Sequence, residues 1–218
     1  MEHKAIDETQ VVVKAKKDYP TEDVIWDFMN IHGLYNKGKK RMLIVGDSIT
    51  GGINSVIREV INSAWEVDSF TTSLPINDRD FLPQLKNALL QSGLQYDMIH
   101  FNNGGHGGET DKEYEESYRE AIALIRKLHP NAKIVLATCI VAYVPEPDGS
   151  FVKRLVRWHG MTDSRDNICR KLCKEYGFEL NDFAEYSVKI KDDHRPDGIH
   201  YNKEGSRKLA FQIIKFAR

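Results

Sequence analysis

The chain alternates short apolar runs with stretches of helical spacing, and this alternation restricts its fold more than any other feature. Met42-Leu43-Ile44-Val45 is a continuous apolar run that ends at Gly46, and residues 49–61 then carry apolar side chains at helical spacing. Further strand patterns, each followed by a helical pattern, occur at 65–70, 97–101, 134–138 and 178–181. Strands separated by helices lie parallel, with right-handed crossovers. The sequence therefore predicts an α/β fold, a flavodoxin-like three-layer α/β/α sandwich with a five-stranded parallel sheet.

At 218 residues, the chain is long enough for one sizeable domain and too short for two. We assign residues 38–218 to this domain. Residues 1–37 match no strand-helix unit, and we expect them to form an N-terminal extension packed on the domain, in which Thr21 to Met29 could be a helix outside the sheet. Between Val141 and Asp163, prolines and the turn signal Asp148-Gly149 predict a long surface loop.

The charges nearly balance, with 31 Lys and Arg against 32 Asp and Glu, so the net charge of -1 predicts no general attraction for nucleic acid or anionic membrane. No apolar run is long enough to span a bilayer. The three cysteines cannot all pair, which favours reduced thiols and a cytoplasmic location, or a secreted one if a signal peptide was removed. We expect no cofactor and no metal, because His106 and Glu109 lack a third ligand. The oligomeric state is left open.

Two short motifs near the ends of the predicted domain carry the groups for acyl transfer. Gly46-Asp47-Ser48 directly follows the first strand, and Asp197-Gly198-Ile199-His200 precedes the last helical pattern. A serine hydroxyl needs an imidazole to accept its proton and a carboxylate to orient that imidazole. Either motif by itself is more often structural, with Asp47 or Ser48 as a helix N-cap. Together, in an α/β chain, they predict Ser48 as nucleophile, His200 as general base and Asp197 as the orienting carboxylate.

This combination resembles the SGNH, or GDSL-like, hydrolase family of esterases and lipases. Gly46-Asp47-Ser48 is similar to the first conserved block of that family and Asp197-Gly198-Ile199-His200 to its last, and the resemblance extends from about Lys39 to the C-terminus. It implies the same three roles for Ser48, His200 and Asp197. The GxSxG motif of the ordinary α/β-hydrolases is absent around Ser48, which disfavours that rival fold.

The middle blocks of the family are changed in this chain. Members usually have a glycine after the second strand and Gly-x-Asn-Asp after the third, which complete an oxyanion hole with the nucleophile's N–H. Here the second position carries no glycine, so Ser73 is a candidate donor, with a role as a turn residue equally open. Alignment on Gly104 puts His106 in the asparagine position, and a neutral imidazole can donate one N–H. His106 is the first choice, and Asn103 or Asn102 is the alternative; for Asn102 we favour a turn role.

The long loop carries aromatic and basic side chains that could hold a sugar or a carboxylate. We expect Tyr143 and Trp158, together with Asp47 beside the nucleophile, to contact substrate, although Trp158 could instead anchor the loop to the core. The expected partner is thus a small-molecule or saccharide ester. The predicted function is a serine esterase for short acyl esters, mainly acetyl esters on carbohydrate. The alternative is a non-catalytic saccharide-binding domain on a decayed hydrolase scaffold, suggested by the missing glycine and by His106.

Overall fold

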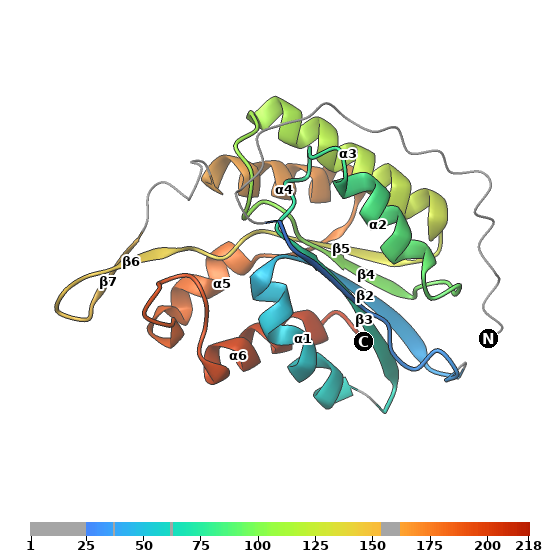
Figure 1. Cartoon of the computed structure of the whole chain (residues 1–218), viewed down its shortest axis with the longest axis horizontal. Helices are drawn as coiled ribbons and strands as arrows, with labels where there is room; N and C mark the ends of the chain where they lie inside the picture. Colours follow the sequence, from blue (N-terminus) through green and yellow to red (C-terminus); the bar gives the residue numbers. More distant parts are fainter. Residues whose placement is uncertain (1–24, 37, 62, 154–161) are drawn as a thin grey trace.

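A six-stranded sheet forms the centre of the protein (Figure 1), in a computed structural model that describes residues 25–36, 38–61, 63–153 and 162–218. In spatial order its strands are β1 (Asp27–Asn30), β3 (Trp65–Thr72), β2 (Lys40–Gly46), β4 (Met98–Phe101), β5 (Lys133–Ala137) and β8 (Glu179–Asn181). The pairs from β3 to β8 are all parallel. Taken in chain order, these five strands have the flavodoxin-like order 2-1-3-4-5, which confirms the predicted fold class.

Helices cover both faces of the sheet (Figure 1). One face carries α2 (Phe81–Leu90), α3 (Asp111–Leu128) and α4 (Thr162–Tyr176). The other carries α1 (Ser48–Ile61), α5 (Phe183–Lys189) and α6 (Lys203–Ile214), with a short 3-10 helix, η2 (Lys191–Asp193), before α6. The capping box predicted at the start of α3 is present, since Thr110 and Glu113 bond each other's backbone N–H.

Strand β2 is buried on both faces and divides the core in two. Leu43 and Val45 pack into the cluster below α2, α3 and α4, whereas Met42 and Ile44 pack into the cluster shared with α1, α5 and α6. All four side chains are fully buried. Side chains of a strand point alternately to its two faces, which is why a continuous apolar run, rather than an alternating one, marks this strand.

The N-terminal segment differs from the expectation. Residues 27–30 form strand β1, which pairs antiparallel with β3 and places Phe28 opposite Thr71 and Met29 opposite Phe70. The prediction of a helix over Thr21 to Met29 is therefore wrong for its described part, while residues 21–24 lie outside the described residues. The sheet has six strands and is mixed, not five and wholly parallel, because β3 offers a free edge that β1 occupies.

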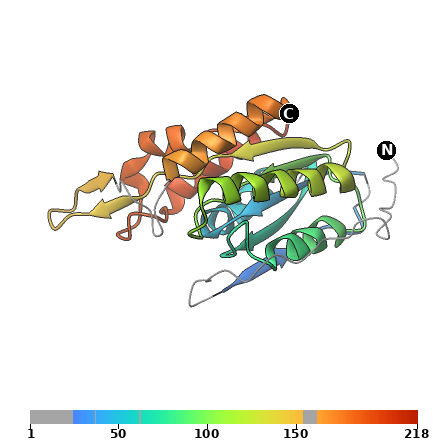
Figure 2. The ribbon, with the colours of Figure 1, turned by 90° about the horizontal axis from the view of Figure 1, so that it is seen from above.

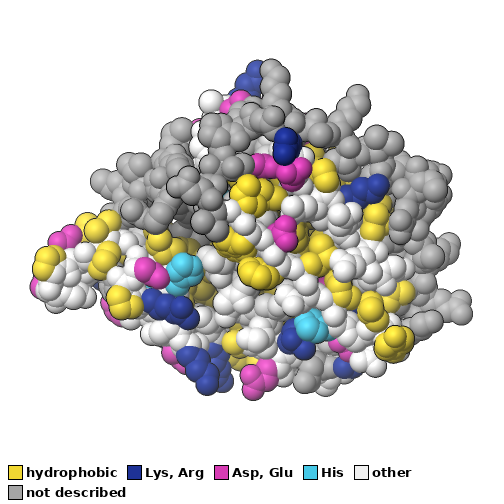
Figure 3. Space-filling view, in the orientation of Figure 1, with side chains coloured by type: hydrophobic (Ala, Val, Ile, Leu, Met, Phe, Trp, Pro, Cys, Tyr) yellow, Lys and Arg dark blue, Asp and Glu magenta, His cyan; other side chains and the backbone are white. Residues whose placement is uncertain are grey.

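The stretch predicted as a loop after β5 contains a hairpin. Strands β6 (Tyr143–Pro145) and β7 (Phe151–Lys153) pair antiparallel around the Asp148-Gly149 turn, where Gly149 has a φ of +82°. The hairpin projects from the body of the molecule (Figure 2) and carries exposed hydrophobic side chains (Figure 3), among them Val144 and Val152. Residues 154–161 lie outside the described part of the chain.

The strand order reverses between β2 and β4, because the chain leaves β2 toward β3 on one side and returns to β4 on the other. In open α/β sheets, ligands bind in the crevice at the carboxyl ends of the strands at such a point. The turns after β2 and β4 both reach this crevice. Over the described residues, every helix is too short or too polar to cross a membrane. The three cysteines are buried and form no disulfide.

Candidate active site

Ser48 is the first residue of α1, directly after the end of β2. The turn is tight: a Cβ on Gly46 would lie 2.0 Å from Oγ1 of Thr50, so a larger residue would displace the first turn of the helix. The Oδ1 atom of Asp47 accepts the N–H of Ile49 at 2.9 Å and stabilises the start of α1. Ser48 therefore lies at a helix N-terminus, where unpaired N–H groups and the helix dipole favour negative charge.

Asp197 and His200 lie in the loop between η2 and α6, and backbone hydrogen bonds fix their relative positions. Oδ1 of Asp197 accepts the N–H groups of Ile199 and His200, both at 2.8 Å. Gly198 has a φ of +68°, and a Cβ there would lie 2.1 Å from the carbonyl oxygen of Tyr143. Tyr143 in turn donates its N–H to the Gly198 carbonyl at 2.8 Å. A non-glycine residue at 198 would therefore strain the loop and push it away from β6.

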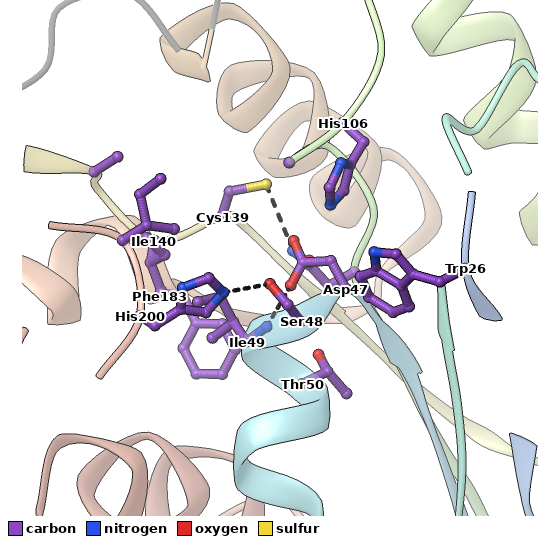
Figure 4. Close-up of a pocket in the computed structure, with 14 residues that line it drawn as sticks. Trp26, Asp47, Ser48, Ile49, Thr50, His106, Cys139, Ile140, Phe183 and His200 are labelled. Carbon is purple, nitrogen blue, oxygen red and sulfur yellow. Dashed lines mark hydrogen bonds between the residues drawn. The ribbon is translucent and has the colours of Figure 1, made fainter. Parts of the chain in front are cut away.

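The three side chains predicted to react lie in one hydrogen-bonded row (Figure 4). Nδ1 of His200 lies 2.9 Å from Oδ2 of Asp197, and Nε2 lies 2.9 Å from Oγ of Ser48. An ionised carboxylate can only accept, so this contact assigns the imidazole proton to Nδ1. Nε2 is then left with a lone pair that accepts the hydroxyl proton of Ser48. The sequence separates Ser48 and His200 by 152 residues, and the fold brings them into contact.

The Asp197 carboxyl is stabilised in its ionised form. Burial by itself would raise its pKa, but the N–H of Ile199 and the side chain and N–H of His200 outweigh burial and hold the pKa below its usual value. The carboxylate is about half exposed, so solvent screens part of this effect. Asp197 therefore carries its negative charge at neutral pH, where it can orient and stabilise the neighbouring imidazole.

A cavity of about 370 Å³ opens over Ser48. Its lining includes the apolar residues Ile140, Ala142, Phe183 and Ile199, and Figure 4 places Ile140 and Phe183 on the side of His200. On the other side, Figure 4 shows Asp47, His106 and Trp26, while Cys139 lies above the serine. A preformed, mainly apolar hollow with a few convergent polar groups is typical of small-ligand sites.

Of the candidate oxyanion donors, His106 lines the cavity, whereas Asn103 and Ser73 bond backbone carbonyls elsewhere. Asn103 is not among the described residues that line it, and its amide donates to the carbonyl of Leu74 at 3.1 Å. The N–H of Ser73 donates to the carbonyl of Trp26 at 3.0 Å, which corrects the expectation that this N–H faces the cavity. The Ser73 N–H thus fixes the segment that leads into β1.

Asn102 reaches the cavity, but its amide has a structural role. Its Nδ2 donates to the carbonyls of Ala137 at 2.9 Å and Thr138 at 3.0 Å, and so ties the end of β4 to the end of β5. These contacts are structural, but they join two strands and do not form the local turn that we favoured for this residue. Of the three candidate side chains, the two asparagine amides thus bond backbone carbonyls, and His106 lines the cavity.

Arg165 of α4 is a site-supporting residue that the sequence did not identify. Its buried guanidinium donates to the carbonyls of Gly104 at 3.2 Å, His106 at 2.8 Å and Gly107 at 3.2 Å. It also lies 3.2 Å from the Glu109 carboxylate and 4.9 Å from the centre of the Tyr114 ring. Burial raises the pKa of Glu109, and Arg165 opposes this rise. One side chain thus fixes the loop that carries His106.

Three residues were expected to contact substrate: Asp47, Tyr143 and Trp158. Asp47 lines the cavity, and its Oδ2 is so close to Gly105 that a Cβ there would lie 2.4 Å away. Tyr143 is buried, with its ring 5.1 Å from that of His194, and it supports the Asp197 loop rather than the described cavity wall. Trp158 lies outside the described residues. Within the described ranges, no group of three or more His, Cys, Asp or Glu side chains could hold a metal.

Comparisons with known proteins identify the fold. No protein-family model matches the sequence, and no curated protein matches it. An acetyl xylan esterase, AlAXEase, is similar in structure with a TM-score of 0.63 and 19% sequence identity, over 82% of this chain and 100% of that chain. A protein from Parabacteroides merdae assigned as a GDSL-like lipase has a TM-score of 0.59 and 18% identity, over 81% and 95% of the two chains.

A carbohydrate esterase of family 3 from Talaromyces cellulolyticus is also similar, with a TM-score of 0.53 and 15% identity, over 82% of this chain and 96% of that chain. These matches cover almost the whole length of the solved structures. At such low identity they establish the fold and not the activity. The chain therefore has the α/β/α fold of the SGNH, or GDSL-like, hydrolases.

Proposed function

We propose that this protein is a serine esterase that hydrolyses short acyl esters, foremost acetyl esters carried on carbohydrate. The observation that carries the proposal is the row of hydrogen bonds from Asp197 through His200 to Ser48, each 2.9 Å long, beneath an open cavity. Distances of this length are within the reach required for proton transfer between a nucleophile and its base. The row ends at a helix N-terminus, where developing negative charge is favoured.

In the first half-reaction, Oγ of Ser48 attacks the ester carbonyl carbon while Nε2 of His200 accepts the hydroxyl proton. The carbonyl π electrons move to oxygen, which becomes an oxyanion. When the tetrahedral intermediate collapses, the bond to the alcohol oxygen breaks, and His200 gives its proton to that oxygen. The alcohol leaves, and the acyl group stays on Ser48.

In the second half-reaction, a water molecule takes the place of the alcohol. His200 accepts one proton from the water as its oxygen attacks the acyl carbon. Collapse of this second intermediate returns the proton to Oγ of Ser48 and releases the carboxylic acid. Asp197 keeps its charge throughout and stabilises the imidazolium that forms twice in the cycle. No cofactor is required, because every electron pair comes from substrate, water or Ser48.

The proposed oxyanion hole consists of the N–H of Ser48 and the imidazole N–H of His106. The first belongs to the α1 N-terminus, and the second comes from a loop that Arg165 holds from behind. Donors fixed before the reaction stabilise the transition state without reorganisation, which is why such groups contribute strongly to rate. In this arrangement the His106 imidazole donates in the place where the family usually has an asparagine.

The proposed substrate class is supported by the structural relatives, two of which are described as an acetyl xylan esterase and a carbohydrate esterase. The cavity agrees with a small substrate, since about 370 Å³ is at the lower end of the range for ligand pockets. Carbohydrate esters also fit the chain's near-neutral charge, because neither the alcohol nor a short acyl group requires a cationic surface.

The direct test is the hydrolysis of p-nitrophenyl acetate and of acetylated xylo-oligosaccharides by wild type and by Ser48→Ala. We expect the substitution to remove activity down to the background rate, because the attacking oxygen is lost. Ser55→Ala is the matched control, since Ser55 is an exposed serine of the same helix. Equal rates for wild type and Ser48→Ala would refute the nucleophile assignment.

A second test does not depend on the choice of ester. Intact-mass analysis after treatment with a fluorophosphonate should show one adduct on wild type, mapped by peptide sequencing to residue 48, and none on Ser48→Ala. Acetyl-saccharide binding by a protein that neither turns over esters nor forms this adduct would instead identify the alternative, a saccharide-binding domain on a decayed scaffold.

A further inference from the structure

Trp26 brings the N-terminal segment into the proposed active site. It directly precedes the edge strand β1, far in sequence from the other residues of the cavity wall, and its side chain lines the same cavity as Ser48 and His200. Figure 4 places its indole on the side of Ser48 opposite to His200, with Asp47 between the serine and the ring. The segment therefore contributes a wall to the cavity as well as a strand to the sheet.

Backbone contacts fix the position of this wall. The N–H of Trp26 donates to Oγ of Ser73 at 3.0 Å, and its carbonyl accepts the N–H of Ser73 at 3.0 Å and Oγ1 of Thr72 at 3.2 Å. These bonds continue the pairing of β1 with β3, in which Asp27 lies opposite Thr72. Because none of them involves the indole, a smaller side chain at position 26 can keep all of them.

The indole also has a defined neighbour on the same side of the cavity. Its ring packs edge-on against the imidazole of His106, with 6.2 Å between ring centres and an angle of 85° between planes. Edge-to-face contacts of this kind are favourable and restrict both rings. Trp26 and His106 together close the end of the cavity that lies away from His200.

The chemistry decides which part of an ester meets this end. His200 must give its proton to the leaving alcohol, so the alcohol oxygen has to lie on the His200 side of the serine. The oxyanion must point at its donors, the N–H of Ser48 and the His106 side chain. The substituent that remains is the acyl chain, which extends away from His200 and toward the indole.

We propose that Trp26 closes the acyl end of the cavity and limits the enzyme to short acyl groups. This inference rests on the proposed function and adds to it the residue that sets acyl length. In this proposal an acetyl group fits on the Ser48 side of the ring, whereas a longer acyl chain has to displace the indole. The ring packs against His106, and the Trp26 backbone is bonded to Thr72 and Ser73. Trp26 thus acts as a steric limit and not as a platform for the sugar.

The test is kcat/KM for p-nitrophenyl acetate, butyrate, hexanoate and octanoate with wild type, Trp26→Phe and Trp26→Ala. Wild type should prefer acetate. Trp26→Ala should raise the hexanoate-to-acetate ratio of kcat/KM by about tenfold or more, since one methylene in a fitted pocket already changes this ratio by about that factor. Trp26→Phe, with a ring of intermediate size, should give a smaller shift in the same direction.

Phe28→Ala is the matched control. Phe28 is an aromatic residue of β1 with an exposed fraction of 61%, its ring lies 5.8 Å from that of Trp26, and it is not among the described residues lining the cavity. Its removal should leave the chain-length ratio unchanged. A shift of equal size in Phe28→Ala would overturn the proposal, because it would attribute the effect to a disturbed β1.

Other outcomes separate this proposal from the proposed function. If wild type and Trp26→Phe hydrolyse acetate in a Ser48-dependent manner and the ratio does not change, the wall proposal is wrong and the esterase proposal stands. An increase of KM for acetylated xylo-oligosaccharides in Trp26→Ala at an unchanged ratio would identify a sugar platform and also overturn it. If wild type shows no Ser48-dependent hydrolysis of any ester, both proposals fail.

Discussion

Nη1 of Arg165 lies 2.8 Å from the carbonyl oxygen of His106, so a residue of α4 holds a residue of the cavity wall that is 59 positions earlier in the chain. The same guanidinium also reaches Gly104 and Gly107, and it lies above the Tyr114 ring. A planar group with five donors can satisfy several carbonyls of one loop at once, and a lysine ammonium cannot reproduce that geometry. The loop thus depends on the shape of Arg165 and not on its charge alone.

Arg165→Lys should therefore lower kcat while KM changes little. The substitution keeps the positive charge beside Glu109 but loses the fork that fixes the His106 carbonyl, and a shift of about 1 Å in a catalytic group can cost about a hundredfold in rate. Steady-state kinetics on p-nitrophenyl acetate give both constants. Arg119→Lys, at a partly exposed ion pair on α3, is the control. Identical kinetics for the two variants would argue against a positioning role.

The side-chain oxyanion donor can be identified by single substitutions. His106→Ala should lower kcat by about two to three powers of ten, because one preorganised donor is lost. His106→Asn should recover part of that loss, since an amide can donate in the same place. Asn103→Ala should keep kcat close to wild type, because its amide donates to Leu74 and not into the cavity. A large loss of kcat confined to Asn103→Ala would reverse the assignment.

Gly105 should be sensitive to one added methyl group in activity rather than in stability. A Cβ at Gly105 would lie 2.4 Å from Oδ2 of Asp47, the end of a flexible side chain, so the clash can be relieved by turning the carboxylate without moving the backbone. The turned carboxylate would release the N–H of Ile49 and disturb the start of α1 beside Ser48. We expect Gly105→Ala to lower kcat/KM by about tenfold or more, with a melting temperature near that of wild type.

Gly52→Ala supplies the matched control for that substitution. Gly52 is an exposed position inside α1, and a Cβ there would have no heavy atom within 4 Å. Alanine is the better helix former by about 1 kcal/mol, so this variant should be more stable and equally active. Thermal unfolding and ester hydrolysis, measured side by side, distinguish the two glycines. Loss of activity in both variants would show that α1 tolerates no change at all.

Local patterns were sufficient to predict the layers and the three side chains of the hydrogen-bonded row. The continuous apolar run of β2 and the helical spacing after it can be recognised within a short stretch of sequence. The same holds for each later pair of strand and helix. Ser48 and His200 could be paired in advance because parallel strands bring their carboxyl ends to one edge of the sheet. The 2.9 Å contact between Nε2 of His200 and Oγ of Ser48 could not be predicted, because it depends on how the 197–200 loop packs against the start of α1.

The parts that could not be predicted depend on contacts between distant residues. Strand β1 has four residues, with Phe28 and Met29 as its apolar pair, which is too little for a periodic signal; its pairing with β3 decides its structure. Trp26 and Arg165 belong to no sequence motif. Their positions are set by contacts with distant residues: the hydroxyl and N–H of Ser73 for Trp26, and the backbone carbonyls of the 104–109 loop for Arg165. Helix α5 has seven residues, too few for helical periodicity to be recognised.

Two buried histidines should make the protein sensitive to mild acid. Burial lowers the pKa of His100 to about 3, and it lowers that of His129 to about 4 despite an opposing hydrogen bond to the Leu89 carbonyl. In the unfolded chain both titrate at about 6.5, so between pH 6.5 and pH 4 the unfolded state binds more protons. The free energy of unfolding is therefore highest above pH 6.5 and falls as the pH is lowered through this window.

His129→Gln should reduce that pH dependence, because one of the histidines with a lowered pKa is removed. Between pH 6 and pH 5, the slope of the free energy of unfolding against pH should be smaller than in wild type by about 1 kcal/mol per pH unit. Urea unfolding at several pH values measures it. Ile57→Val, a conservative change in the opposite core cluster, destabilises without removing a histidine and should keep the wild-type slope. An unchanged slope in His129→Gln would mean that His129 is protonated in the folded protein, contrary to its burial and to the hydrogen bond that Nδ1 accepts from Tyr96.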